Sequence, residues 1–198
     1  DINSIMAGRL FDKLEQEAFR AGIQARTKAS MNWFQDRVSS MSVSRPALIK
    51  DGPTRVRKIF GMMYNFQYDP KNKKTLPYYD RFPLVIPVQP AKGGFHGMNL
   101  HYIAPNWRAQ FLDALLDITN NNQFDTSTKF RLTYKLMQGA KKYRFYKPCF
   151  KHYLSEHIKT KLLLIEPQDW EIAIFLPTEQ FIRKSKATVW KESRKMFQ

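Results

Sequence analysis

The chain has 198 residues, and its 43% hydrophobic and 14% aromatic content excludes a wholly disordered protein. A single cysteine, Cys149, excludes a disulfide framework and fits a reducing compartment. Since no apolar run reaches the roughly 18 residues of a membrane span and no signal peptide is visible, we expect neither a transmembrane helix nor a membrane partner.

Positive charge dominates the chain and gathers in its last third. There are 33 Lys and Arg against 17 Asp and Glu, which gives a net charge of +16. Residues 127–198 hold 16 basic and 6 acidic side chains, whereas residues 61–126 hold 6 basic and 5 acidic side chains. Such an excess predicts a polyanionic partner, and nucleic acid, acidic protein subunits or simple solubility can each explain it.

The N-terminal stretch predicts two helices. Apolar residues recur at helical spacing across Ile5–Ala18, and Gly22 fits the left-handed position that ends a helix. Thr27 or Ser30 can cap a second helix. Together they predict an αα-hairpin over residues 1–40 that stands free or docks on a partner, with a DNA-recognition helix as the alternative.

Residues 41–60 are rich in Ser, Pro and Gly and are predicted to be a mostly irregular linker. This divides the chain into an N-terminal helical extension over residues 1–40, the linker, and a core domain over residues 61–198 with basic C-terminal helices. Three cations before the first predicted strand either contact phosphate or are simply solvated. They are Arg55, Arg57 and Lys58.

Three strands are predicted within the near-neutral centre of the chain. Met62–Tyr68 and Phe95–Ile103 alternate apolar and polar residues, and Phe82–Val88 is a short apolar run with β-branched residues. Pro83 and Pro87 lack an N–H, so they indicate an edge strand or a bulge. We therefore expect an α+β fold: a small antiparallel β-meander, as an SH3-like barrel or an open sheet, surrounded by helices and preceded by the helical hairpin.

The C-terminal half continues with helices and one further strand. Pro105 suits the first turn of a helix. Cys149–Lys159 is predicted as a helix, and Leu162–Ile165 as a short strand. Another helix begins near Pro167, and the basic tail Lys184–Phe197 is predicted to be helical.

The strongest candidate for a binding site alternates cations with aromatic rings. Nucleic acids can engage such a segment through phosphates and base faces together. The first patch consists of Lys141, Lys142, Arg144, Lys147 and Lys151. A second patch consists of Arg183, Lys184 and Lys186. The alternative is an amphipathic segment whose aromatic residues are buried and whose lysines are solvated.

No arrangement in the sequence argues for catalysis. Cys149, His152 and His157 are spaced so that they cannot share one helical face, and no second cysteine completes a metal site. The carboxylates are scattered, and Asp80, next to Arg81, fits a turn cap or a local salt bridge. We therefore predict a non-enzymatic protein without a metal or cofactor.

Two stretches have a distinctive pattern: residues 76–85, LPYYDRFPLV, and residues 94–102, GFHGMNLHY. They resemble virion proteins of T4-like myoviruses of the cyanophage type, and the chain is most similar to the DNA end protector family of these phages. The resemblance implies a structural or accessory protein of the head or neck that binds the ends of packaged double-stranded DNA. It also implies that the protein shields these ends from host exonuclease, as one part of a multi-subunit virion, and that it occupies the host cytoplasm during assembly.

A second virion role fits the same resemblance. A baseplate subunit of the wedge or hub, or a neck subunit of a contractile-tailed phage, would dock its basic faces on acidic neighbouring subunits. The resemblance carries over no residue-level function, so the candidate cations rest on the charge and aromatic pattern alone.

Overall fold

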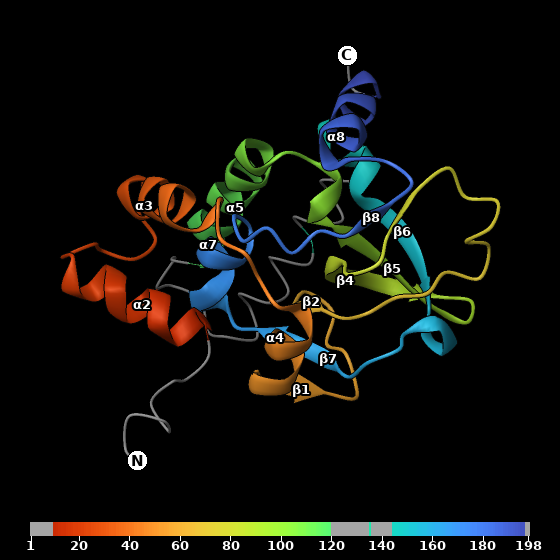
Figure 1. Ribbon diagram of the computed structural model, residues 1–198, viewed down its shortest axis with the longest axis horizontal. Helices are drawn as coiled ribbons and strands as arrows, with labels where there is room; N and C mark the ends of the chain where they lie inside the picture. Colours follow the sequence, from red (N-terminus) through yellow and green to blue (C-terminus); the bar gives the residue numbers. More distant parts are fainter. Residues whose placement is uncertain (1–9, 120–134, 136–143, 197–198) are drawn as a thin grey trace.

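The computed structural model describes residues 10–119, Lys135 and residues 144–196. Over these residues the chain forms an open six-stranded sheet in the order β1-β7-β2-β4-β5-β6, and a separate two-stranded sheet of β3 and β8. Figure 1 shows helices α2, α3, α5 and α7 gathered on one side of the strands. The predicted α+β class is confirmed, and the sheet is open rather than a barrel.

The strands are short and the helices vary in length. The main sheet consists of β1 Thr54–Arg55, β7 Leu162–Ile165, β2 Met63–Asn65, β4 Leu84–Ala91, β5 Gly94–Asn99 and β6 Phe150–Leu154, and the small sheet of β3 Tyr79–Asp80 and β8 Phe181–Ile182. The α-helices are α2 Leu10–Arg20, α3 Lys28–Val38, α4 Arg45–Asp51, α5 Pro105–Thr119, α7 Trp170–Ala173 and α8 Lys186–Lys195. The 3-10 helices are η1 Leu100–Tyr102, η2 Arg144–Cys149, η3 Ser155–His157 and η4 Pro167–Asp169. No described helix combines the length and apolarity needed to cross a bilayer.

The predicted meander forms the centre of the main sheet. β2 pairs with β4, and β4 with β5, both antiparallel, which confirms the three predicted strands and their order. The register of β4 shifts between Pro87 and Gln89, so the predicted bulge is confirmed even though β4 is a central strand. Gly93 has a φ of 75° and closes the turn between β4 and β5.

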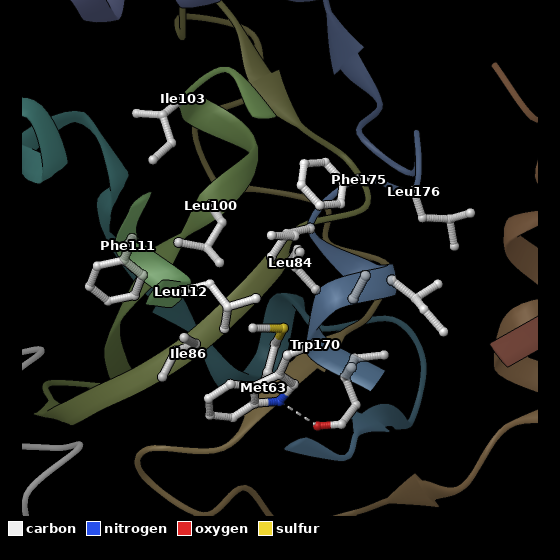
Figure 2. Close-up of a cluster of buried hydrophobic side chains, with 14 of the residues drawn as sticks. Met63, Leu84, Ile86, Leu100, Ile103, Phe111, Leu112, Trp170, Phe175 and Leu176 are labelled. Atoms are coloured by element: carbon white, nitrogen blue, oxygen red, sulfur yellow. Dashed lines mark hydrogen bonds between the residues drawn. The ribbon is translucent and has the colours of Figure 1, made fainter. Parts of the chain in front are cut away.

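The face of the sheet toward the helices carries the main hydrophobic core. Met63, Leu84 and Ile86 are completely buried there. Trp170 of α7 packs into the same cluster, and its Nε1 donates to the carbonyl oxygen of Ile165 at 3.0 Å (Figure 2). Because each fully buried large apolar side chain contributes about 1.5–3 kcal/mol, this cluster is what fixes the helices to the sheet.

The opposite face of the sheet carries a second, aromatic core. The rings of Tyr68 and Tyr153 lie 4.9 Å apart between centroids, and Phe95 stacks on Tyr153 at 5.6 Å. Gly97 leaves room for these rings, since a Cβ there would lie only 2.4 Å from Val85 Cγ1. Both faces of the sheet are therefore covered, one by helices and one by aromatic side chains and loops.

The N-terminal helices α2 and α3 pack on the same main core as the sheet. The predicted cap at Thr27 is confirmed, since it forms a reciprocal capping box with Ser30, and Gly22 ends α2 with a φ of 71°. Glu171 of α7 accepts hydrogen bonds from the Arg26 N–H and the Ser30 hydroxyl, which ties the hairpin to α7. The predicted domain boundaries stay a prediction.

One predicted element is wrong, and one helix was not predicted. Cys149–Lys159 is not a helix: Phe150–Leu154 forms β6, which pairs with β5, and η3 follows it. The apolar spacing of this segment is compatible with a helix or a strand, and pairing with the edge of β5 selects the strand. The helix that was not predicted is α4, Arg45–Asp51, which Ser44 caps, although most of residues 41–60 lie outside helices and strands as expected.

A carboxyl pair joins α2 to η4 and predicts a pH effect on stability. Burial first, then a hydrogen bond with Glu15 and nearby negative charges, raise the pKa of Asp169 to about 8. The folded chain therefore keeps a proton that the unfolded chain releases above about pH 4, so this contribution to stability falls as the pH rises from about 4 to about 8.

Asp169→Asn is expected to raise the free energy of unfolding at pH 8 by about 1–2 kcal/mol, allowing for solvent screening of a partly exposed group. Near pH 3 the same variant should match the parent closely, because Asp169 is then mostly protonated in both the folded and the unfolded chain. Urea denaturation at the two pH values measures the difference. An equal gain at both would contradict the prediction.

Candidate nucleic-acid interface

The first predicted patch is only partly within the described residues. Lys141 and Lys142 lie outside them, and Arg144 is described only as the first residue of η2. Lys147 is exposed on the same 3-10 helix, which packs against α8. Lys151 lies in β6. The structure therefore places Lys147 beside the C-terminal helix and Lys151 in the sheet.

Lys151 is a partly buried cation that lacks an acidic partner among the described residues. Its Nζ lies 3.9 Å from the centroid of the Tyr102 ring, a close cation–π contact. Burial lowers the pKa of this ammonium. Because a desolvated cation without a carboxylate is costly, an anion that reached Lys151 would be bound favourably.

The cations of the second predicted patch form hydrogen bonds and ion pairs within the protein. Arg183 has a left-handed backbone, with a φ of 76°, and its Nη1 donates to the carbonyl oxygens of Lys73 and Leu76. Lys184 Nζ lies 2.6 Å from Glu192 Oε1. These two cations therefore hold the loop between β2 and β3 and the start of the C-terminal segment in place.

Helix α8 carries the last predicted cation and three that the sequence analysis did not single out. Lys186 Nζ lies 3.1 Å from Glu179 Oε1. Further along, three exposed cations share a face because they are three and four residues apart. They are Lys191, Arg194 and Lys195. Their helical spacing was the signal that could have identified them.

A cleft of about 340 Å³ lies between the β2–β3 loop and β6. In Figure 1 this loop is the long yellow segment beside β6. Lys151 lines the cleft together with Tyr78 and Tyr102, whose ring centroids are 6.1 Å apart. Lys184 Nζ lies 4.7 Å from the centroid of Tyr78, and Arg183 holds the loop. Of the predicted cations Lys151 lines the cleft, whereas Lys184 and Arg183 contact residues of its wall, Tyr78 and Leu76.

The loop itself adds cations that were not predicted as part of a binding site. Lys71 lines the cleft, and Lys74 is exposed beside it. Lys73 pairs with Asp69 at 2.9 Å across one turn of the loop. The signal in the sequence was three lysines within four residues. It indicates a binding surface only when the loop is known to lie against β6.

A buried polar network supports one wall of the cleft. Asp80 Oδ2 lies 2.7 Å from His101 Nδ1 and accepts from Asn99 Nδ2 at 3.0 Å. Its other oxygen accepts from the N–H groups of Phe82 and Gln180, so the predicted turn cap is confirmed. Burial raises the pKa of Asp80, but the attraction and hydrogen bond of His101 outweigh it and hold that pKa below its ordinary value.

The network continues from His101 into the C-terminal segment. His101 Nε2 lies 3.0 Å from Thr178 Oγ1, and Trp190 Nε1 of α8 donates to the His101 carbonyl at 2.8 Å. An aspartate, a histidine and a hydroxyl in line are the parts of a nucleophilic triad. Here Asp80 is 4% exposed, His101 0% and Thr178 1%, so the hydroxyl that would act as the nucleophile is buried, and the arrangement holds α8 and β3 in place.

The other residues that could take part in catalysis or metal binding are buried or hydrogen-bonded within the protein. Burial raises the pKa of the Cys149 thiol to about 12, which leaves it unreactive at neutral pH. Tyr146, from the aromatic segment, is buried in the main core. His152 Nε2 and His157 Nδ1 each lie within hydrogen-bonding distance of a backbone carbonyl. Across residues 10–119 and 144–196, no three His, Cys, Asp or Glu side chains are placed to hold a metal ion.

Comparison with known proteins identifies the family of this chain. A family model described as Phage T4 terminal DNA protecting protein matches residues 3–196. The chain belongs to this family. No curated protein and no solved structure matches the chain. The resemblance to the DNA end protectors of T4-like phages is therefore confirmed, and membership of the terminal DNA protecting family assigns the chain a DNA-protecting role in a phage.

Proposed function

We propose that this chain binds the ends of packaged double-stranded DNA in the phage particle and shields them from host exonuclease. The observation that carries the proposal is the match of the terminal DNA protecting family over residues 3–196. Occluding a terminus requires only a bound protein, so no reacting group is needed. This agrees with a structure whose aligned Asp80, His101 and Thr178 are all buried.

The cations around the cleft and along α8 supply the phosphate contacts. Each neutralised phosphate releases counterions, so affinity comes from many modest contacts rather than one strong one. The ion pairs of Lys184 and Lys186 are partly exposed and can exchange a carboxylate for a phosphate. The contacts from the predicted patches are Lys141, Lys142, Arg144, Lys147, Lys151, Arg183, Lys184 and Lys186. To these we add five cations that are exposed on the β2–β3 loop and on α8: Lys71, Lys74, Lys191, Arg194 and Lys195.

The test uses the purified chain with a short blunt duplex and with a closed circle of the same DNA. With about five phosphate contacts, affinity should fall roughly 500-fold between about 50 and 200 mM salt. The linear DNA, once saturated, should resist a double-strand exonuclease, and the circle should compete poorly for the protein.

Two results would overturn the proposal. One is an absence of binding at about 50 mM salt. The other is degradation of saturated linear DNA at the rate of free DNA. Either result, combined with binding to an acidic virion subunit, would favour the baseplate or neck role instead.

A further inference from the structure

The cleft between the β2–β3 loop and β6 has the dimensions of a small-ligand pocket. Its volume of about 340 Å³ lies near the lower end of the range of about 300–1,000 Å³ for such pockets. A pocket of this size suits one nucleotide-sized group rather than a stretch of stacked duplex. Most of the cleft wall consists of polar and aromatic side chains, which fits a ligand with both a charge and a flat ring.

The charge in the cleft favours an anion. Lys151 Nζ lies over Tyr102 and has no carboxylate partner among the described residues, and Lys71 lines the same space. Asp80 also lines the cleft, but its two oxygens are taken up by His101 and by three N–H donors. The cations are therefore available to a ligand, while the one carboxylate is already neutralised by its partners.

The aromatic side of the cleft favours a planar ring next to that anion. Tyr78 is partly exposed, and its ring is tilted by 35° to the buried ring of Tyr102. Lys184 covers Tyr78 at 4.7 Å. Every nucleobase has a flat π-face, so stacking on such a ring tolerates any sequence.

We propose that this cleft receives the terminal nucleotide of a DNA end, with its terminal phosphate on Lys151 and its base against Tyr78, an inference that rests on the proposed function. A base at an end leaves the stack more easily than an internal one, because it has a neighbour on one side only. A terminal phosphate monoester carries about −1.5 to −2 at neutral pH, whereas an internal diester carries about −1. Lys151 therefore distinguishes an end from the interior of the duplex.

Binding to hairpin-capped duplexes with one open end tests the assignment by fluorescence anisotropy. Ends with a 5′-phosphate, with a 3′-phosphate and with neither phosphate are compared. The parent chain should bind one of the phosphorylated ends about tenfold or more tightly than the unphosphorylated end. The preferred end identifies the strand whose terminus enters the cleft.

Lys151→Met keeps the length of the side chain and removes its charge. It should abolish the preference for the phosphorylated end. It should also weaken binding of the unphosphorylated end by up to about tenfold, as the loss of one ordinary phosphate contact does. Lys151→Arg should retain the preference. Lys28→Met, at an exposed position on α3, is the matched control and should change neither affinity. Melting temperatures verify that each variant is folded.

A fluorescent base analogue gives a second readout that needs no variant. Placed at the terminal position, 2-aminopurine should change its emission on binding, whereas the same analogue in the duplex interior should not. Equal affinity of the parent chain for all ends, or unchanged terminal emission, overturns the pocket while DNA binding itself persists. Absence of binding to every duplex overturns the proposed function and the pocket together.

Discussion

Asp80→Ala is expected to lower the free energy of unfolding by about 3–5 kcal/mol. The substitution removes the acceptor for two backbone N–H groups and for the Asn99 amide, and it leaves His101 without its carboxylate partner. Phe82, Asn99 and His101 are buried and Gln180 is partly buried, so water cannot replace most of the lost contacts. Asp80→Asn keeps the volume and one acceptor oxygen, so its loss should be roughly half as large. Urea denaturation near neutral pH measures both variants.

The pH dependence of this effect has a definite sign. Because the pKa of Asp80 is lowered in the folded chain, its stabilising contribution is present above about pH 4 and is lost as the pH falls through the folded pKa. As the pH is lowered below about 4, the free energy of unfolding of Asp80→Ala should therefore fall less than that of the parent chain. Asp36→Ala, at an exposed position on α3, is the control and should leave the denaturation midpoint unchanged. Similar losses from the two alanine variants would contradict a central role for the network.

Neutralising two cations of the β2–β3 loop and two of α8 is expected to weaken duplex binding by about 100- to 1,000-fold near 100 mM salt. The variant replaces Lys71, Lys74, Lys191 and Arg194 with glutamine, all at exposed positions. Since each lost phosphate contact removes about 0.9 from the slope of log affinity against log salt, the slope should become shallower by about 3 to 4. Stability should change little, because none of the four side chains is buried.

The matched control removes the same charge from the other side of the molecule. Lys13, Arg20, Lys28 and Arg37 are exposed on α2 and α3, which lie across the molecule from β6 and the β2–β3 loop (Figure 1). Their replacement by glutamine should change affinity by less than about tenfold through net charge alone. Equal losses from the two sets would mean that affinity follows total charge, and the interface would then have to be reassigned.

Much of the sheet could be predicted because its signals are local. Alternation of apolar residues identified two strands of the meander and a short apolar run identified the third, while Pro87 indicated the bulge by its missing N–H. Thr27 and Gly22 marked helix ends through side-chain and backbone preferences that need no tertiary contact. Ser44 before Pro46 was an equally local signal for α4, and it was overlooked in a segment rich in turn residues.

The remaining features depend on partners far away in the sequence. Phe150–Leu154 has an apolar spacing compatible with helix or strand, and only the edge of β5, more than 50 residues earlier, selects the strand. Asp80 and His101 have no special spacing, and their pairing exists only because η1 folds back on β3. Charge predicted the class of partner, but it could not indicate that Lys151 would line a cleft whose loop is held by Arg183.

The β2–β3 loop at this cleft is held by Arg183, a residue that is synthesised long after the loop itself. Arg183 fastens the carbonyls of Lys73 and Leu76, residues more than a hundred positions earlier in the chain. Because a ribosome makes the chain from its N-terminus, the lysine-bearing loop is expected to stay unfastened until residue 183 has been synthesised and has emerged. A nascent chain would thus expose the lysines of this loop before their final arrangement forms, and this part of the DNA-binding surface would be complete only after Arg183 has emerged.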